Sequence, residues 1–400
     1  MAIMVPLDFF HVTSRRHFIQ GAGLATTATM LGTPARAQSA APRAVVEDIR
    51  TISLQPQYYH GWPTVTRRHN GDLAVVVSGG RQGHICPFGR VEMMVSRDQG
   101  ATWHWPQVIL DSPSDDRDAG ILETAKGTLL ATTFTSLAYE RLLLDAEKKQ
   151  GQPGAWPEER LRAWQLAYNR FNAEERKANL GEWMIRSNDG GITWSARYPT
   201  IVNSPHGPIQ LSDGRLLYAG KQLWTPEKRA GVCVSNDDGA TWQWLAEIPA
   251  RTGDSAAQYH ELHAVEAGEG RLIVHIRNEN KNGHGETLQT ESADGGKTWN
   301  EPHSIGVWGL PSFLNRLRDG RLLMTYGHRR APLGNQARLS TDAGRTWSEP
   351  LIIYGDGASG DLGYPSTVEF DDGSLLTVWY EHLKESPYAV LRQARWKITA

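Results

Sequence analysis

Cysteine, surplus charge of one sign and long apolar runs are all scarce in this 400-residue chain. Cys86 and Cys233 are the two cysteines, so neither a disulfide framework nor a thiolate metal site is predicted. The formal net charge of −2 gives no basic surplus for nucleic acid and no acidic tail. Beyond the N-terminal region, no stretch is long and apolar enough to span a bilayer. We therefore expect no nucleic-acid partner, no membrane partner, no metal and no cofactor.

The N-terminal 37 residues have the three parts of an export signal. Arg15 and Arg16 precede Phe18, residues 21–31 are weakly apolar, and residues 35–37 read Ala-Arg-Ala, a small-residue cleavage site. The paired arginines indicate a twin-arginine signal peptide over residues 1–37. The sequence thus predicts the twin-arginine export machinery as a partner during secretion, and a periplasmic or secreted mature protein.

A repeated turn motif dominates the remaining chain. The pattern S-x-D-x-G-x-T-W occurs five times, beginning at Ser96, Ser187, Ser235, Ser292 and Ser340. The Asp side chain can accept hydrogen bonds from turn amides, the Gly supplies a positive φ, and the Trp can pack between sheets. Six short G-x-L turns alternate with these motifs, beginning at Gly71, Gly127, Gly214, Gly270, Gly320 and Gly373. The count predicts an all-β protein, a six-bladed β-propeller with four strands per blade, in a single domain over residues 38–400.

The ends of the chain are expected to meet in one blade. In blade one we predict strands over 63–68, 73–78, 91–96 and 107–110. Blade six runs out of chain after its third strand, over 389–396. Its fourth strand should come from residues 45–54, which would close the ring and remove a free sheet edge.

The spacing between turn motifs is about 50 residues except between Ser96 and Ser187. The excess lies in residues 137–180, where apolar residues recur at helical intervals among Glu, Lys and Arg. We interpret it as a helical insertion in blade two, with its loop at residues 150–153. Two roles are open: a wall or lid beside the site, or an insertion unrelated to it.

Propeller geometry indicates which face carries chemistry. The S-x-D-x-G-x-T-W turns join strands three and four and lie on one face. The starts of first strands and the ends of second strands lie on the other face. Residues at those positions from all six blades are polar, a concentration that favours a ligand site. They include His60, Trp62, Arg81, His84, residues 115–118, His206, Lys221, residues 259–261, Arg277, Ser312, Arg329, Arg330, Tyr364, Tyr380 and Glu381.

This set suits recognition of an anionic ligand. Arg81, Arg277 and Arg329 could converge on a carboxylate, which arginine binds bidentately. Tyr364 with Glu261 has the composition of an activated nucleophile, because a carboxylate can accept the phenol proton. A tyrosine nucleophile also suits an anionic substrate, which would repel a carboxylate.

With these residues, the chain resembles the sialidase superfamily of Asp-box, or BNR-repeat, propellers over residues 45–400. The resemblance implies a six-bladed propeller, three arginines around the sugar carboxylate, a Tyr nucleophile assisted by Glu, and an Asp acid/base. Glu261 in Tyr-His-Glu-Leu and Arg277 in Val-His-Ile-Arg-Asn match the family's Glu and second arginine. Arg329 or Arg330 in Tyr-Gly-His-Arg-Arg matches the third arginine, and Tyr364 in Leu-Gly-Tyr-Pro-Ser matches the nucleophile.

Two positions depart from the family pattern. Gly61-Trp62-Pro63 stands where the first arginine's Arg-Ile-Pro motif is expected. Residues 79–84 contain no carboxylate at the place of the family's acid/base Asp. We therefore expect His84, His206 or Asp118 as the proton donor, since His can serve as an acid/base near neutral pH. Trp62, Arg81, Arg330 and His206 complete the predicted substrate contacts.

Three functions are compatible with this sequence. The first is an exo-acting, retaining glycoside hydrolase on a terminal acidic sugar, with Tyr364 as nucleophile, Glu261 as its base and His84 or Asp118 as acid. The second is a polysaccharide lyase on uronate-containing glycans, using His or Tyr, which the histidines at 84, 206 and 260 favour. The third is a non-catalytic glycan-binding propeller. All three predict an acidic carbohydrate as the partner.

Overall fold

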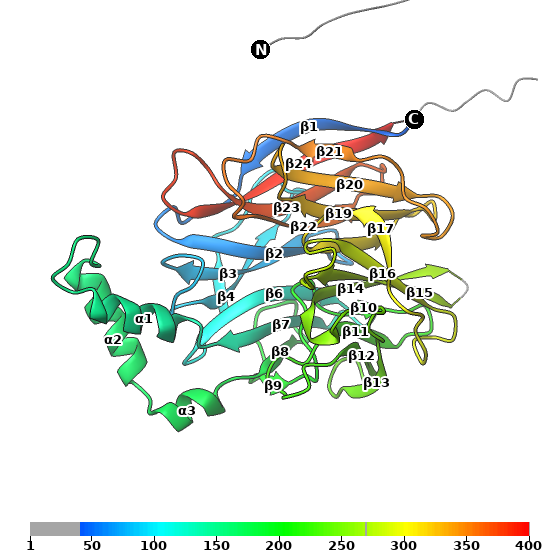
Figure 1. Ribbon diagram of the computed structural model, residues 1–400. Helices are drawn as coiled ribbons and strands as arrows, with labels where there is room; N and C mark the ends of the chain where they lie inside the picture. The colour runs from blue at the N-terminus through cyan, green and yellow to red at the C-terminus, as the bar shows by residue number, and fades with distance from the viewer. Residues whose placement is uncertain (1–40, 269, 400) are drawn as a thin grey trace, which may run out of the picture. The chain divides into compact units, whose positions relative to one another are not determined.

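Six four-stranded antiparallel sheets are arranged around a central axis as the blades of a β-propeller (Figure 1). The computed structural model describes residues 41–268 and 270–399. Residues Ala41–Ala400 form one compact unit. The predicted signal peptide lies outside the described residues. The six-bladed, all-β architecture predicted from the two sets of turns is confirmed.

Each of the first five blades is a consecutive run of four strands. Blade one comprises β2 (Tyr59–Arg67), β3 (Leu73–Arg81), β4 (Arg90–Ser96) and β5 (Gln107–Leu110). Blade two comprises β6 (Asp115–Glu123), β7 (Leu129–Ser136), β8 (Glu182–Ser187) and β9 (Tyr198–Pro199). Blade three comprises β10 (Ile209–Gln210), β11 (Leu216–Lys221), β12 (Ala230–Ser235) and β13 (Gln243–Glu247).

The later blades repeat this order, and a short 3₁₀ helix, η1 (Ala256–Gln258), leads into blade four. Blade four comprises β14 (Tyr259–Gly268), β15 (Arg271–Asn278), β16 (Thr287–Ser292) and β17 (His303–Val307). Blade five comprises β18 (Ser312–Arg316), β19 (Leu322–His328), β20 (Gly334–Ser340) and β21 (Leu351–Tyr354). Blade six comprises β22 (Leu362–Glu369), β23 (Leu375–His382), β24 (Ala389–Thr399) and β1 (Arg43–Thr51).

The two ends of the described chain pair within blade six. β1 runs antiparallel to β24, with Arg43 opposite Thr399 and Thr51 opposite Arg392. This is the ring closure expected from the missing fourth strand, and it removes the edge that β24 would otherwise expose.

Burial follows the position of a strand within its blade. Every residue of β3 is buried, because neighbouring strands and blades cover both of its faces, and its sequence is correspondingly rich in Val. The outer strand β1 instead alternates between exposed and half-buried residues. The core is therefore distributed between the blades as well as around the axis.

The S-x-D-x-G-x-T-W turns hold neighbouring blades together. In the turn that begins at Ser292, Asp294 accepts hydrogen bonds from the amide of Thr298 (2.9 Å) and from its hydroxyl (2.6 Å). Trp299 donates from Nε1 to the Gly296 carbonyl at 3.0 Å, and its ring packs in the apolar cluster between blades three and four. These contacts are scaffold contacts, on the face opposite the polar set described above.

Helices occupy the excess length in blade two. α1 (Tyr139–Lys148), α2 (Glu158–Asn169) and α3 (Ala173–Ala178) lie between β7 and β8 and project from the ring (Figure 1). Their apolar residues, including Leu143 and Trp164, pack against Cys86 in the loop after β3. Trp164 also donates from Nε1 to Oε1 of Gln82 at 2.8 Å. The insertion therefore braces the loop that carries His84.

No helix in the described part of the chain has the length and apolar character needed to cross a membrane.

Candidate active site

The same backbone distortion occurs at the start of four first strands. Trp62, Asp118, Glu261 and Tyr364 have φ angles of 56°, 49°, 46° and 54°, in the left-handed region. Each lies in a register shift of its strand, so the local pairing contains a bulge. A left-handed non-glycine residue costs on the order of 1–3 kcal/mol, which the surrounding sheet must offset. Bulges re-aim side chains, and here they direct residues of blades one, two, four and six toward one area.

Blade three carries a glycine at the corresponding position. Gly207 precedes Pro208, as Trp62 and Tyr364 precede prolines, and its φ is 76°. A Cβ on the facing Gly120 would lie 2.5 Å from the Gly207 nitrogen, so the two blades approach too closely for side chains here. Blade three therefore contributes backbone where the other four blades contribute a functional group.

Tyr364 and Glu261 are directly hydrogen-bonded. The Tyr364 hydroxyl donates to Oε1 of Glu261, and Arg277 donates to Oε2 of the same carboxylate at 2.8 Å. Burial raises the pKa of the Tyr364 phenol well above its ordinary value, and the Glu261 charge raises it further. Burial would also raise the pKa of Glu261, but the Arg277 charge and the two hydrogen bonds lower it overall. At neutral pH the pair therefore consists of a protonated phenol and an ionised carboxylate positioned to accept its proton.

Asp118 lies close to this pair and is 7% exposed. Burial raises the pKa of Asp118 to about 7, the charge of Arg117 lowers it, and the charge of Glu261 raises it again. A carboxyl group that is half protonated at neutral pH can act as both an acid and a base. Asp118 is thus chemically suited to the proton-donor role considered for it from the sequence.

Arg329 faces the tyrosine, and Arg330 does not. The Arg329 guanidinium lies over the Tyr364 ring, with Cζ 5.8 Å from the ring centroid, and its Nε donates to the Leu362 carbonyl at 3.0 Å. Arg330 is exposed and stacks on Trp308 at 4.4 Å. Of the two arginines considered for one position, Arg329 lies beside Tyr364, and Arg330 stacks on Trp308.

His84 belongs to a polar group that the sequence interpretation missed. Its Nδ1 lies 2.9 Å from Oδ1 of Asp361, and the same oxygen accepts hydrogen bonds from the hydroxyls of Tyr59 (3.1 Å) and Tyr380 (3.0 Å). Nε2 of His382 is 3.3 Å from the other oxygen of Asp361. Burial would raise the pKa of Asp361, but the hydrogen bonds from His84 and the two tyrosines lower it to about 2.

The imidazole of His84 is 46% exposed, so a fixed carboxylate orients an accessible ring. One signal in the sequence could have indicated Asp361 as a site residue, namely its position three residues before Tyr364.

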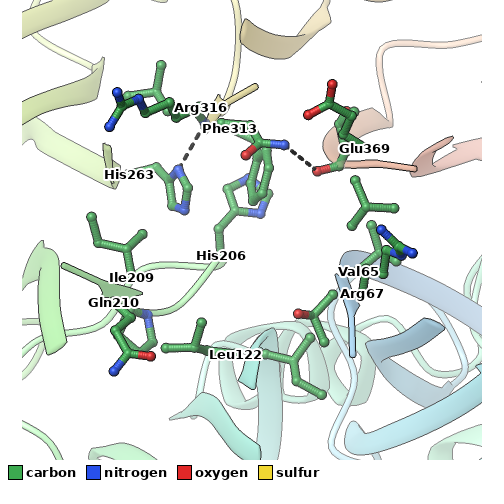
Figure 2. A pocket seen from close by; sticks show the side chains of 17 residues that line it. Val65, Arg67, Leu122, His206, Ile209, Gln210, His263, Phe313, Arg316 and Glu369 are labelled. Carbon is green, nitrogen blue, oxygen red and sulfur yellow. Dashed lines mark hydrogen bonds between the residues drawn. The ribbon is translucent and has the colours of Figure 1, made fainter. Parts of the chain in front are cut away.

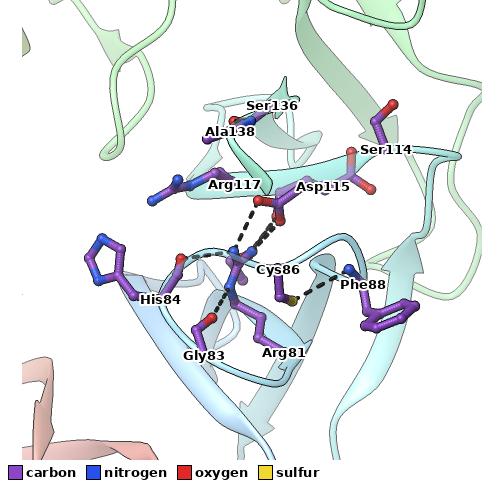
Figure 3. A network of polar contacts seen from close by, with 12 residues as sticks. Arg81, Gly83, His84, Cys86, Phe88, Ser114, Asp115, Arg117, Ser136 and Ala138 are labelled. Atoms are coloured by element: carbon purple, nitrogen blue, oxygen red, sulfur yellow. Dashed lines mark hydrogen bonds and ion pairs between the residues drawn. The ribbon is translucent and has the colours of Figure 1, made fainter. Parts of the chain in front are cut away.

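Arg81 is structural, which corrects its prediction as a substrate contact. It is fully buried and forms two bonds with Asp115, at 2.6 and 3.1 Å, as Figure 3 shows. Its remaining N–H groups donate to the Ser78 hydroxyl and to the backbone carbonyls of Gly83, His84 and Asp116. The guanidinium therefore anchors the loop of His84 to blade two and has no donor left for a ligand.

Trp62 is also covered, which corrects its prediction as a substrate contact. Its ring is 1% exposed and lies 5.0 Å from the His84 ring and 6.3 Å from the Tyr364 ring, centroid to centroid. Arg81 and Arg117 lie over it at 4.9 and 4.5 Å. Trp62 sets the spacing between the His84 group and the Tyr364 group.

His206 lies next to the Tyr364 ring, with 6.4 Å between the two ring centroids, but it is too deeply buried for its predicted role as a substrate contact or acid. The ring is 2% exposed and contacts His263 and Phe313, with centroids 5.4 and 5.1 Å away. These three residues line a cavity of about 340 Å³ along the axis (Figure 2). That cavity is otherwise lined by the far ends of the first strands, including Arg67 and Glu369, so it belongs to the opposite side of the ring. Burial lowers the pKa of His206 to about 3, so the ring is neutral at neutral pH.

Among the described residues, no group of three or more His, Cys, Asp or Glu side chains is arranged to hold a metal ion. The chemistry available at the site is that of a phenol, carboxyl groups, an imidazole and arginines.

Comparison with known protein families shows to which family the chain belongs. The BNR repeat-like domain family matches residues 140–377, which is more than half of the sequence, so the chain belongs to that family. Together with the six blades, this identifies a sialidase-like BNR propeller. No curated protein matches the sequence.

Solved structures share this fold at low sequence identity. A protein of unknown function from Dyadobacter fermentans is 21% identical, with a TM-score of 0.72, covering 89% of this chain and 99% of that one. The NanB sialidase of Streptococcus pneumoniae is 14% identical, with a TM-score of 0.61 and coverage of 88% and 70%. The intramolecular trans-sialidase of Ruminococcus gnavus is 14% identical, with a TM-score of 0.59 and coverage of 88% and 96%. At these identities the likeness concerns the fold alone.

Proposed function

We propose that this protein is a retaining glycoside hydrolase that releases a terminal acidic sugar. The observation that carries the proposal is the hydrogen bond between Tyr364 and Glu261, with Arg277 on the carboxylate and Arg329 over the phenol ring. The NanB sialidase shares this fold and supports the choice of reaction, and an intramolecular trans-sialidase of the same fold is described in complex with oseltamivir carboxylate.

In the proposed mechanism, Arg277 and Arg329 bind the sugar carboxylate. The Tyr364 oxygen attacks the anomeric carbon while its proton passes to Glu261, and the bond to the leaving oxygen breaks as Asp118 or His84 protonates it. Water then attacks the anomeric carbon of the glycosyl–tyrosine, and the bond between that carbon and the Tyr364 oxygen breaks. Its proton passes to the group that acted as acid, and Tyr364 recovers its proton from Glu261.

The first test is turnover of a fluorogenic sialoside by the protein and by Tyr364→Phe. We expect the variant to lose at least 100-fold in kcat, since the phenol oxygen forms the covalent bond. Tyr354→Phe is the matched control, because its hydroxyl lies at the end of the outer strand β21 and donates to the Asp356 carbonyl in the loop that follows. A Tyr364→Phe variant as active as the control would refute the nucleophile.

The exposed imidazole held by Asp361 favours a second candidate, a lyase on uronate-containing glycans. There His84 would remove the proton α to the uronate carboxylate, and the leaving oxygen would take a proton from a tyrosine. Incubation with uronate polysaccharides distinguishes the two reactions. A lyase produces an ultraviolet-absorbing unsaturated uronate, while a hydrolase produces only new reducing ends. Glycan affinity without either product would indicate the non-catalytic propeller.

We further propose that the mature protein acts in the periplasm or outside the cell, after export by the twin-arginine machinery. The support is the Arg15-Arg16 pair with the following apolar segment and Ala-Arg-Ala site. Substituting both arginines by lysine in the full chain should retain the precursor in the cytoplasm, and fractionation of expressing cells measures this.

A separate proposal concerns the helical insertion. We propose that it forms one wall of the site, because it packs on the loop that carries His84.

A further inference from the structure

The place of the missing first arginine leaves little room for a side chain. A Cβ on Gly61 would lie 3.0 Å from Cε1 of the Tyr59 ring. Tyr59 cannot move away freely, because its hydroxyl bonds to Asp361 in the His84 group. An arginine at position 61 would therefore disturb Asp361 and His84, so any further cation at the site must come from another strand.

The arginines around the site differ in how many of their guanidinium N–H groups already have a hydrogen-bond acceptor. Arg81 has all its donors engaged, and Arg277 is paired with Glu261 and Glu279. Arg329 gives its Nε to a carbonyl. Arg117 is the exception, because its Nε is buried without a hydrogen-bond partner within residues 41–268 and 270–399. The Arg117 charge lowers the pKa of Asp118, but a buried N–H donor without an acceptor is costly, and such a group is expected to find its acceptor in a ligand.

The fold nevertheless holds Arg117 in one place. Its Cζ lies 4.5 Å from the centroid of the Trp62 ring, a cation–π distance, and Thr133 donates a hydrogen bond to its backbone carbonyl at 2.7 Å. Trp62 contacts both His84 and Tyr364, so the guanidinium is tied to the ring that joins the two parts of the site. Figure 3 shows the side chains of Arg117 and His84 pointing to the same side, away from the Arg81–Asp115 pair.

We propose that Arg117, stacked on Trp62, is a carboxylate-binding residue for the acidic sugar and takes over the role that an arginine at position 61 would have. This inference rests on the proposed function and names a recognition residue for the same site. Arg117 comes from blade two and approaches from the side of Trp62, whereas Arg277 and Arg329 approach from blades four and five. The carboxylate is then bound between cations on opposite sides of Tyr364.

The test compares charged and neutral forms of one substrate. KM and kcat are measured for 4-methylumbelliferyl N-acetylneuraminide, for 4-methylumbelliferyl glucuronide and for the carboxyl methyl ester of each. Loss of a charge-assisted hydrogen bond predicts that Arg117→Gln raises KM for the acid form by about 10- to 100-fold. The ester should change by less than about threefold, because it has no carboxylate to lose. Arg117→Lys should recover part of the loss on the acid form.

Arg229→Gln is the matched control, since Arg229 stacks on Trp244 of the outer strand β13 at the same 4.5 Å, but lies in the loop before β12 with its Nε bonded to Gln222. Thermal unfolding of each variant reports whether the fold is intact. If wild-type protein turns over neither glycoside, the proposed function fails, and this inference fails with it. If wild-type protein is active and Arg117→Gln leaves KM unchanged, or affects acid and ester equally, only the assignment of Arg117 is overturned.

Discussion

The raised pKa of Asp118 leads to a prediction about the pH dependence of catalysis. Burial raises this pKa from the ordinary value of 3.8 to about 7. At pH 7 about half of the Asp118 side chains are then protonated, against roughly one in a thousand at the ordinary value. If Asp118 donates the proton to the leaving oxygen, activity requires the protonated form. We expect kcat/KM to fall about tenfold per pH unit above pH 7.

The acid side of the profile should be limited by Glu261. Its carboxylate must be ionised to accept the Tyr364 proton, and its pKa is held below the ordinary value of 4.5. Activity should therefore persist below pH 4.5 and then decline as Glu261 becomes protonated. The result is a bell-shaped profile with an alkaline limb from Asp118 and an acid limb from Glu261.

Asp118→Asn tests the assignment, because the amide keeps the shape of the side chain and cannot donate a titrating proton. We expect kcat/KM to fall by about 100-fold or more on a substrate with a sugar leaving group, and the alkaline limb to disappear. On a 4-nitrophenyl glycoside the loss should be small, since that leaving group departs without protonation. The assignment of Asp118 as proton donor would be refuted if the Asp118→Asn variant kept the alkaline limb, or if its kcat/KM fell equally on both substrates. The profile of His84→Gln would then identify the donor.

Three further outcomes follow from the structure. Trp299→Ala should lower the free energy of unfolding by about 3 kcal/mol, since a nearly buried ring between two blades is removed, and Trp299→Phe by less; denaturant titration measures both. Burial raises the pKa of Asp116 to about 7, so its stabilising contribution is complete below pH 4 and is lost as the pH rises through 7. Asp116→Asn should flatten the decline in melting temperature over that range. Asp361→Asn should lower kcat more than it raises KM, because the His84 ring loses the carboxylate that orients it.

The scaffold was largely predictable because its signals are local and repeated. Each S-x-D-x-G-x-T-W turn marks the end of a third strand. Counting from these turns predicted six blades and the completion of blade six by the N-terminal strand. The pairing of Tyr364 with Glu261 followed from the same count, because both stand at the starts of first strands.

Residue type and position in the sequence did not predict which side chains of the site are buried or which charged groups pair with each other. Arg81 and Arg117 are both arginines on the same face, yet the structure gives Arg81 a buried carboxylate and leaves the Nε of Arg117 without an acceptor among the described residues. Asp361 was missed because it lies in a loop before β22, outside the positions that the count examined. Which side chain neutralises which is decided by packing between blades that are distant in sequence, and no local pattern records it.

Because β1 pairs with β24, the two ends of the described chain lie side by side, and the ring of blades does not depend on where the chain is opened. Arg43 lies opposite Thr399, so a short linker could join these two ends while a new opening is made in any exposed turn. Such a circular permutant would contain all six sheets and the same site, with the exchanged strand moved to a different blade. It also follows that during synthesis blade six cannot be completed until residues 389–399 have left the ribosome, because β24 pairs with the first described strand.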